Sequence, residues 1–544
     1  MSASNKKKLQ ADASKVTEKQ LAEHQQDREV KMYTIGFAVV MAVILVIAIA
    51  AGSMQLISNS GIREKKTIAY TVGDHQISSA EFSYYFTDTV NNFMSQYGSY
   101  ASIFGLDTTK PLNEQVMNEE DGTTWADDFM NNARESAKSV YAISDEAKAQ
   151  GHTLTQENKD AIDAAIANIE MYAQVNGLGS AKNYLKAVYG KGADLDSYRN
   201  YLELSMIADT YRAAHEESLT YDDADFREHE KDNYNQYSSF TYNQYYLPAD
   251  SFLEGGTTDE EGNVTFTQEE KDASIKACEE AAKELTSDKV ASVADLDKLI
   301  SSLPMNKETP DAASTLYEHS DFRSMPADIA SWLADSSRKT GDRTYIPNNI
   351  SSQNEEGETV TKIGGYTVLF YGDRDDNTDL LPNVRHILVS YEGGTTDENG
   401  MTTYSEEEKA AAKKKADELL ASYEAGELTE DAFAALATEN SMDPGSKDNG
   451  GLYENVYRGQ MVPTFNDWVF DNGRKTGDTG IVATEYGYHV MYYCGDGTMS
   501  YRDSMIRTEL AQADMDAWYQ GLMDAVVTTD GDTSMIKTDL VLGR

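Results

Sequence analysis

The side chains able to do chemistry in this sequence are few, and their spacing decides which chemistry to expect. Only two cysteines occur, Cys278 and Cys494, and there is no CxxC pair and no Cys/His cluster at metal-ligand spacing. A disulfide scaffold is therefore excluded, and a zinc site is not expected. The two thiols are interpreted as unpaired, with one bridge between them as the alternative. The acidic runs "DRDDNTD" and "EGGTTDE" lack the spacing of a calcium loop, so we expect solvated loops, with calcium binding as the less favoured alternative.

Three apolar side chains in the C-terminal half can line one pocket. Met461 and Phe465 are four residues apart, which puts them on one face of a helical turn. Leu452 follows the pair Gly450-Gly451 and can complete the wall. Two histidines, in "VRHILV" and "TEYGYHVMYY", are the only ones between residues 380 and 498, and an aspartate stands in "SMDPGS".

These residues lie in the second of two similar segments of the chain. Three blocks recur in the same order: "EGGTTDEEG" (254–262) returns as "EGGTTDENG" (392–400), "SWLADSSRKTGD" (331–342) as "DWVFDNGRKTGD" (467–478), and "GGYTVLFYGD" (364–373) as "YGYHVMYYCGD" (486–496). One matching loop can arise by chance, but three in order predict two domains of one fold. We place them at residues 238–375 (the first copy) and 380–498 (the second copy).

Each copy has the pattern strand, loop, helix, helix, Gly-rich loop, helix and strand. The helix after each repeated loop opens with a capping box, Thr267-x-x-Glu270 in the first copy and Ser405-x-x-Glu408 in the second. The predicted fold class is α+β, with an antiparallel sheet of about four strands and covering helices in each copy.

Residues 67–235, before the two copies, are mostly helical by the three- and four-residue spacing of their apolar side chains. A short strand near Tyr70 precedes a helix whose start carries the capping box Ser78-x-x-Glu81. Residues 499–544 read as an amphipathic helix and a closing strand, which we expect to return and pair near Tyr70. The two parts predict a helical, chaperone-like module. Its tyrosine-rich stripes are expected in the packed core, with contact to unfolded chains as the alternative.

The N-terminal region predicts a membrane anchor. Residues 32–57 form a run of 26 residues without a charged side chain, longer than the ~20 that cross a bilayer core. Residues 1–31 hold seven Lys/Arg against five acids, which favours a cytoplasmic N-terminus. We therefore predict a single-pass signal anchor in the cell membrane, with residues 58–544 extracytoplasmic. A cleaved signal peptide is the alternative.

The overall charge limits the partners. The formal net charge is −45, and no basic stripe interrupts the acidic excess after residue 66. Such a field repels nucleic acid and anionic lipid. Nucleic-acid binding is therefore excluded.

The second copy, from Asn383 to about Gly497, resembles the parvulin (PpiC-type) peptidyl-prolyl cis-trans isomerases. The matching pieces, in order, are "VRHILV" (384–389), "FAALATENSMDPGSKDNGGL" (433–452), "RGQMVPTF" (458–465) and "TEYGYHVMYY" (484–493). The layout of anchor, helical module, central parvulin-like domains and returning C-terminal helix resembles the PrsA/SurA type of extracytoplasmic foldase.

The resemblance implies a role for each candidate site residue. The implied catalytic residues, with the two histidines at facing strand positions on the pocket floor, are His386, Asp443 and His489. The implied substrate-binding residues, the first three of them proline-ring contacts, are Leu452, Met461, Phe465, Thr484 and Tyr486. The departure "GGLYENVY" after the paired glycines bears on substrate preference.

Prolyl isomerisation asks for no cofactor. The barrier is ~18–20 kcal/mol because the C–N bond is partly double, and a thousandfold acceleration needs about 4 kcal/mol of transition-state stabilisation. An apolar pocket for the ring and polar groups that favour the twisted amide can supply it. No basic cluster stands near the predicted pocket, so phospho-Ser/Thr-Pro specificity is not expected.

The first copy lacks the candidate site residues. The place of His386 falls to Tyr245 or a neighbour in "NQYYLP", that of His489 falls to Thr367, and nothing matches "SMDPGS". We expect an inactive module used for spacing or client contact. The leading hypothesis is a membrane-anchored extracytoplasmic prolyl isomerase that acts on unfolded or newly exported polypeptides with X-Pro bonds. The alternative is a holdase chaperone in which isomerisation is incidental; a homodimer stays open.

Overall fold

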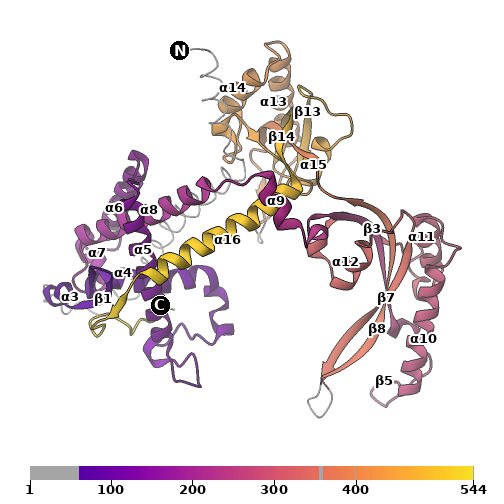
Figure 1. Cartoon of the computed structure of the whole chain (residues 1–544), viewed down its shortest axis with the longest axis horizontal. Helices are drawn as coiled ribbons and strands as arrows, with labels where there is room; N and C mark the ends of the chain where they lie inside the picture. Colours follow the sequence, from indigo (N-terminus) through magenta and orange to yellow (C-terminus); the bar gives the residue numbers. More distant parts are fainter. Residues whose placement is uncertain (1–60, 354–358, 398–399, 543–544) are drawn as a thin grey trace. The chain divides into compact units, whose positions relative to one another are not determined.

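The computed structural model describes residues 61–542, except 354–358 and 398–399 (Figure 1). The predicted tail 1–31 and anchor 32–57 lie outside the described residues. Among the described residues, no helix is both long and apolar enough to span a membrane. The chain divides into two compact units, one comprising the part up to Thr220 and the part from Leu510, the other Tyr221–Glu509.

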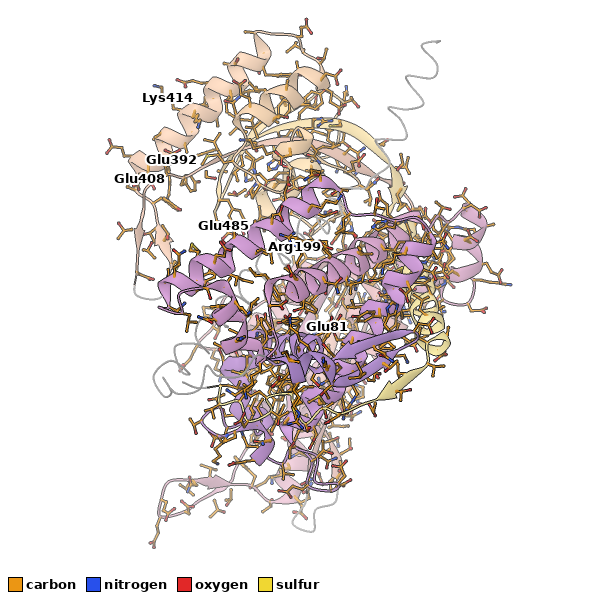
Figure 2. All side chains as sticks on the ribbon, turned by 90° about the vertical axis from the view of Figure 1, so that its left-hand side faces the viewer. Glu81, Arg199, Glu392, Glu408, Lys414 and Glu485 are labelled. Carbon is orange, nitrogen blue, oxygen red and sulfur yellow. The ribbon has the colours of Figure 1, made fainter. Side chains whose placement is uncertain are left out.

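The first unit is a helical assembly with one small sheet. Its main elements are β1 (Ile68–Val72), β2 (His75–Ser78), α4 (Ser79–Tyr97), α5 (Trp125–Ala149), α6 (Gln156–Val175), α7 (Ala181–Tyr189), α8 (Leu195–Ser218), the later part of α16 (Tyr501–Ala525) and β15 (Thr528–Asp530). The predicted capping box at the start of α4 is present, because Ser78 accepts from the Glu81 N–H and Glu81 from the Ser78 N–H. The capping glutamate is labelled in Figure 2.

The C-terminal strand closes the small sheet of this unit. The strand order is β15-β1-β2, and Tyr70 lies opposite Asp530 in an antiparallel pair. The pairing expected near Tyr70 is therefore confirmed. The tyrosine-rich stripes are core, as predicted: Tyr84, Tyr184 and Tyr198 are all buried and pack in one aromatic cluster.

In the second unit, the first copy is a four-stranded antiparallel sheet with helices on both faces. The strand order is β6-β3-β8-β7, from β3 (Ser239–Pro248), β6 (Thr315–Asp321), β7 (Arg343–Gln353) and β8 (Thr359–Asp375). The helices α10 (Gln268–Leu285) and α11 (Val293–Ser302) cover one face, and α12 (Ala327–Leu333) packs on the other. Figure 1 shows α10 and α11 beside the sheet.

The second copy repeats this arrangement strand for strand. Its order is β12-β9-β14-β13, from β9 (Leu380–Ser390), β12 (Leu452–Tyr453), β13 (Thr479–Thr484) and β14 (Gly487–Ser500). The helices α13 (Glu406–Glu424) and α14 (Glu430–Asn440) cover one face, and α15 (Pro463–Val469) covers the other. The predicted α+β class, with antiparallel sheets of about four strands under helices, is confirmed.

The same Arg–Trp contact locks the loop after α12 and after α15. The Arg338 Nε donates to the carbonyl of Trp332 at 3.0 Å and its guanidinium lies 4.5 Å from the indole. In the second copy, the Arg474 Nε donates to the carbonyl of Trp468 at 3.0 Å, and its guanidinium lies 4.0 Å from the indole. The duplication therefore extends to side-chain contacts that hold the scaffold.

The repeated EGGTTDE loops are structural hairpins. In each copy the loop forms a two-stranded pair, and the capping-box glutamate of the next helix reaches back to it. Glu270 Oε1 accepts from the Gly256 N–H at 3.0 Å, and Glu408 Oε1, labelled in Figure 2, accepts from the Gly394 N–H at 2.9 Å. Within the described part of the chain, no group of three or more His, Cys, Asp or Glu could hold a metal ion. Neither Cys278 nor Cys494 forms a disulfide bond.

Candidate active site

The two candidate histidines come from the central strands of the second copy. On β9 and β14, His386 lies opposite Met491 and His489 lies opposite Leu388, so the histidines are diagonal neighbours on one face of the sheet. They are 3% and 5% exposed, and their rings are 5.1 Å apart and nearly parallel. The sheet alone therefore brings together two side chains that are 103 residues apart in the sequence.

The imidazoles belong to one hydrogen-bonded chain. The two Nδ1 atoms are 2.9 Å apart, His386 Nε2 is 2.8 Å from Asp443 Oδ2, and His489 Nε2 is 2.8 Å from Thr484 Oγ1. One consistent proton assignment has Thr484 donating to His489, His489 to His386, and His386 to the Asp443 carboxylate. The network thus runs in one direction and ends on an anion.

Asp443 is held by donors from three sides. Ser446 Oγ at 2.5 Å and Tyr453 Oη at 2.9 Å donate to Oδ2, and the Gly445 N–H donates to Oδ1 at 3.0 Å. Burial alone would raise the pKa of Asp443, but His386, the Ser446 hydroxyl and the Gly445 N–H lower it well below its usual value. Asp443 is therefore a fixed carboxylate at neutral pH.

His489 is neutral at the same pH. Burial, together with the neighbouring His386, lowers the pKa of His489 to about 3, against a smaller opposing effect of Asp443. A neutral imidazole has one donor and one acceptor nitrogen, as the relay position between Thr484 and His386 requires.

The apolar wall of the site is carried by α15. Phe465 is 2% exposed, and its ring meets both imidazoles edge to face, at 5.5 Å from His386 and 5.4 Å from His489. Met461 precedes α15 and is therefore not on a helical turn with Phe465, as the spacing predicted, but it packs in the same apolar cluster. Leu452 is half-buried on the edge strand β12, opposite Arg385, and lies outside that cluster. Of the three predicted proline-ring contacts, Met461 and Phe465 thus lie together in the apolar wall, whereas Leu452 does not.

Thr484 and Tyr486 differ in their relation to the network. Thr484 contacts His489 directly through its hydroxyl. The Tyr486 side chain is 58% exposed, and only its backbone N–H reaches the network, by donating to Thr484 Oγ1 at 3.2 Å. The Tyr486 phenol is therefore placed at the surface rather than in the buried network.

The paired glycines fix the backbone of His386. Gly451 has φ 73°, and a Cβ there would lie 2.2 Å from the His386 carbonyl oxygen. The His386 N–H donates to the Gly451 carbonyl at 2.8 Å. Only glycine fits this close approach, which explains why the pair precedes the edge strand.

Two residues of the site were not among the predicted ones. Ser446 is fully buried and contacts both Asp443 and His386 Nε2. Tyr453 contacts Asp443, and its ring lies 5.2 Å from that of His386 at an interplanar angle of 37°. Ser446 could have been found from its place in "SMDPGS". Tyr453 stands at the departure "GGLYENVY", and nothing local in the sequence indicates that its hydroxyl faces the aspartate.

The strand register of the first copy identifies the missing histidine positions. Thr367 takes the place of His489, as predicted, since it pairs with Tyr246 as His489 pairs with Leu388. The place of His386 is taken by Gln244, the neighbour of Tyr245. No imidazole pair can form there.

The four-stranded sheet of the second copy thus carries on one face a buried histidine pair that is hydrogen-bonded to an aspartate. Residues 370–493 match the family model described as the PPIC-type PPIASE domain, so the chain contains a parvulin-type peptidyl-prolyl isomerase domain.

A foldase is among the curated proteins that are similar to this chain. The chain is 45% identical over 60 residues to the "Foldase protein PrsA" of Caldanaerobacter subterraneus subsp. tengcongensis, over 11% of this chain and 19% of that protein. It thus spans about a fifth of the length of that relative.

Two solved structures that are similar to this chain are also of proteins named PrsA. The peptidylprolyl isomerase PrsA of Bacillus anthracis is 22% identical, over 28% of this chain and 59% of that one, with a TM-score of 0.17. PrsA of Bacillus subtilis is 26% identical, over 26% and 47%, with a TM-score of 0.18. The assignment of the domain rests on the family match.

Proposed function

We propose that this protein is an extracytoplasmic foldase whose second copy catalyses cis-trans isomerisation of X-Pro bonds in unfolded polypeptides. The observation that carries the proposal is the buried imidazole pair, tied to a fixed carboxylate and walled by Phe465. The site residues proposed are those predicted from the sequence, with Ser446 and Tyr453 as positioning residues for Asp443.

The proposed mechanism is non-covalent. Met461 and Phe465 offer an apolar wall for the prolyl ring, which would hold the ring while the rest of the chain turns about the C–N bond. The planar amide has the more negative carbonyl oxygen, because its nitrogen lone pair is delocalised. A fixed anion such as Asp443 therefore disfavours the planar form more than the twisted one, and this difference lowers the barrier.

We assign isomerase activity to the second copy alone and a spacing or client-binding role to the first copy. The first copy keeps the scaffold contacts but has Gln244 and Thr367 at the histidine positions. Membrane attachment through residues 32–57, a cytoplasmic N-terminus and polypeptide clients are part of the same proposal. The similarity to a foldase supports the client class.

The test is an isomerisation assay on the full chain in mild detergent, with a prolyl tetrapeptide as substrate. We expect catalysis above the uncatalysed rate, reduced at least about tenfold by His386→Ala and by Asp443→Ala. The matched control is Gln244→Ala with Thr367→Ala, which changes the equivalent positions of the first copy and should leave the rate unchanged.

A holdase gives a different pattern. If the wild-type chain is no faster than background yet still suppresses the aggregation of an unfolded client, the isomerase proposal is wrong. If the second-copy variants lose isomerase activity but still support the maturation of client proteins to the wild-type level, isomerisation is incidental to the chain's role.

A further inference from the structure

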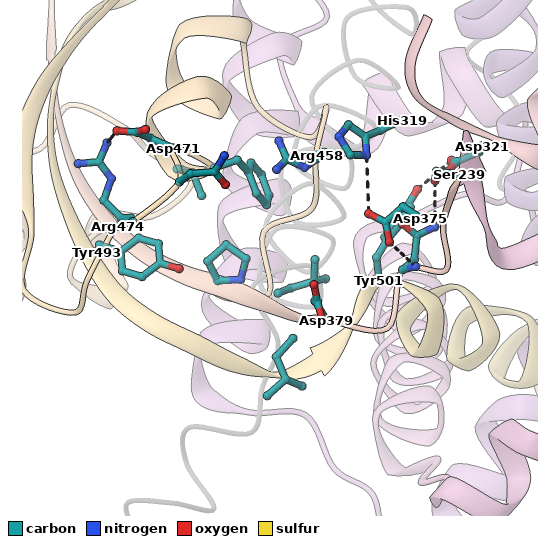
Figure 3. A pocket seen from close by; sticks show the side chains of 18 residues that line it. Ser239, His319, Asp321, Asp375, Asp379, Arg458, Asp471, Arg474, Tyr493 and Tyr501 are labelled. Atoms are coloured by element: carbon teal, nitrogen blue, oxygen red, sulfur yellow. Dashed lines mark hydrogen bonds and ion pairs between the residues drawn. The ribbon is translucent and has the colours of Figure 1, made fainter. Parts of the chain in front are cut away.

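A cavity of about 320 Å³ lies in the second unit where the two copies meet, a size at the lower end for ligand pockets. The first copy and the linker contribute polar residues, and the second copy contributes the loop after α15. Figure 3 shows Asp321, Asp375 and Tyr501 at one end and Asp471, Arg474 and Tyr493 at the other. None of the predicted prolyl-site residues lines this cavity.

The wall formed by the linker is fixed by a buried arginine. Arg502 is fully buried, pairs with Glu230, and donates to the carbonyls of Asp376 at 3.1 Å and Tyr234 at 2.7 Å. Its backbone N–H donates to the Asn377 carbonyl at 3.0 Å. The cavity is therefore preformed, and a guest need not order the linker first.

Asn377 ties the same wall to the first copy. Its side-chain amide donates to the Tyr237 carbonyl and to Ser239 Oγ, both at 2.9 Å. Its backbone N–H donates to Asp375 Oδ1 at 2.7 Å, which orients that carboxylate at the cavity wall.

The charges of the lining are unbalanced. Four aspartates line the cavity but only two arginines do, and Arg474 is already paired with Asp471 at 3.0 Å. Of the other acids, Asp375 lies 3.7 Å from His319 Nδ1, which also lines the cavity, and Asp321 accepts hydrogen bonds from Ser239 and Tyr501. Asp379 is exposed and makes no hydrogen bond or ion pair with the described residues. The cavity is therefore acidic toward a guest.

The lining also has an apolar part. Leu380, at the start of β9, is 51% exposed at the cavity wall. Phe470 lines the same space, and the guanidinium of Arg458 lies 4.4 Å from its ring. A guest that fits both parts carries a positive charge beside an apolar side chain.

We propose that this cavity binds an extended polypeptide segment with a lysine or arginine next to an apolar residue. The basic group faces Asp375 and Asp379, and the apolar side chain packs on Leu380 and Phe470. The inference rests on the proposed function, since it takes clients to be unfolded polypeptides. It gives the first copy a role, because a client held here and at the prolyl site is bound at two points of one unit, which makes the second contact intramolecular.

The test measures binding to the full chain in mild detergent by fluorescence anisotropy. The probe is a short, proline-free peptide of alternating lysine and leucine, compared with its glutamate counterpart. We expect Asp375→Asn with Asp379→Asn to raise the Kd of the lysine peptide about three- to tenfold, and Leu380→Ser to raise it too. The control pair Asp250→Asn with Asp311→Asn removes the same charge from exposed sites of the first copy outside the cavity and should leave the Kd unchanged.

The outcomes separate this inference from the proposed function. An unchanged Kd in the cavity variants, equal effects of the control pair, or equally tight binding of the glutamate peptide overturns the cavity as a binding site. Prolyl isomerisation of a tetrapeptide is measured on the same proteins and should not change in the cavity variants. If isomerisation is absent from the wild type while the cavity variants still weaken the lysine peptide, the proposed function fails and the binding site stands.

Discussion

The neutral state of His489 makes a prediction about stability. Burial lowers the pKa of His489 to about 3 in the folded chain, while an unfolded histidine has a pKa of about 6.5. The unfolded chain therefore binds the proton first as the pH falls. The stability contributed by keeping this imidazole neutral is complete above pH 6.5 and is lost progressively between about 6.5 and about 3.

The magnitude follows from the difference between the two pKa values. At about 1.4 kcal/mol for each pH unit, wild-type protein should lose about 2.5 kcal/mol from this group between pH 7.5 and pH 4.5. In His489→Gln this loss is absent, so the difference in unfolding free energy between the two proteins should shrink by that amount over the same range. Titrating groups that do not interact with His489 are common to both proteins and cancel.

The assay is urea unfolding of 5-fluorotryptophan-labelled protein, followed at the Trp468 resonance. Trp468 packs against the apolar cluster around Phe465 and so reports on the second copy. The matched control is Ser446→Ala, which removes a buried hydroxyl from the same network but keeps His489. It should lower stability by about 1–3 kcal/mol at every pH, parallel to wild type. If wild type and His489→Gln run parallel from pH 7.5 to 4.5, the imidazole is not held neutral by its burial and the reasoning is wrong.

Three further predictions concern the scaffold. Gly459→Ala should lower the free energy of unfolding by about 1–2 kcal/mol in thermal unfolding, because Gly459 has a positive φ. Gly451→Ala should lower it by at least twice as much, because Gly451 also has a positive φ and its Cβ would lie 2.2 Å from a backbone atom. Equal losses would contradict the close approach. Arg502→Met should destabilise the second unit by about 3 kcal/mol in urea unfolding, since it leaves Glu230 buried without this partner, whereas Lys414→Met removes an exposed helix pair and should cost under about 0.5 kcal/mol. Burial raises the pKa of the Cys278 thiol to about 11, so at pH 8 a maleimide should label Cys494 in the native chain well before Cys278; equal labelling rates would show that the thiol is not shielded.

Local signals were enough to predict the helix starts and the duplicated scaffold. The capping boxes at Ser78, Thr267 and Ser405 depend only on residues three apart, and all are present. The repeated blocks predicted two sheets of one design, and the strand orders agree. Interactions with short sequence separation are readable because the backbone itself brings the partners together.

The register of the first copy was harder to read. The strand "SFTYNQYYLP" has apolar or aromatic residues on both faces, so its hydrophobic pattern fits two registers that differ by one residue. The sequence alone therefore did not decide whether Tyr245 or one of its neighbours takes the place of His386. The pairing with β8 decides for Gln244. Similarly, Tyr453 reaches Asp443 across the loop of paired glycines, a contact set by tertiary packing.

The pairing of β15 with β1 has a consequence for how the chain is completed as it is made. Both copies of the duplicated domain end before residue 501, so each can close while later residues are still emerging. The first unit begins near Tyr70 but obtains its third strand only from Thr528–Asp530, and Ser79 Oγ bonds the Asp532 carbonyl across 453 residues. Its core also includes Ile536 and Leu540. The module that starts first therefore finishes last, and a chain cut short after the second copy would leave its apolar core open while both central domains are complete.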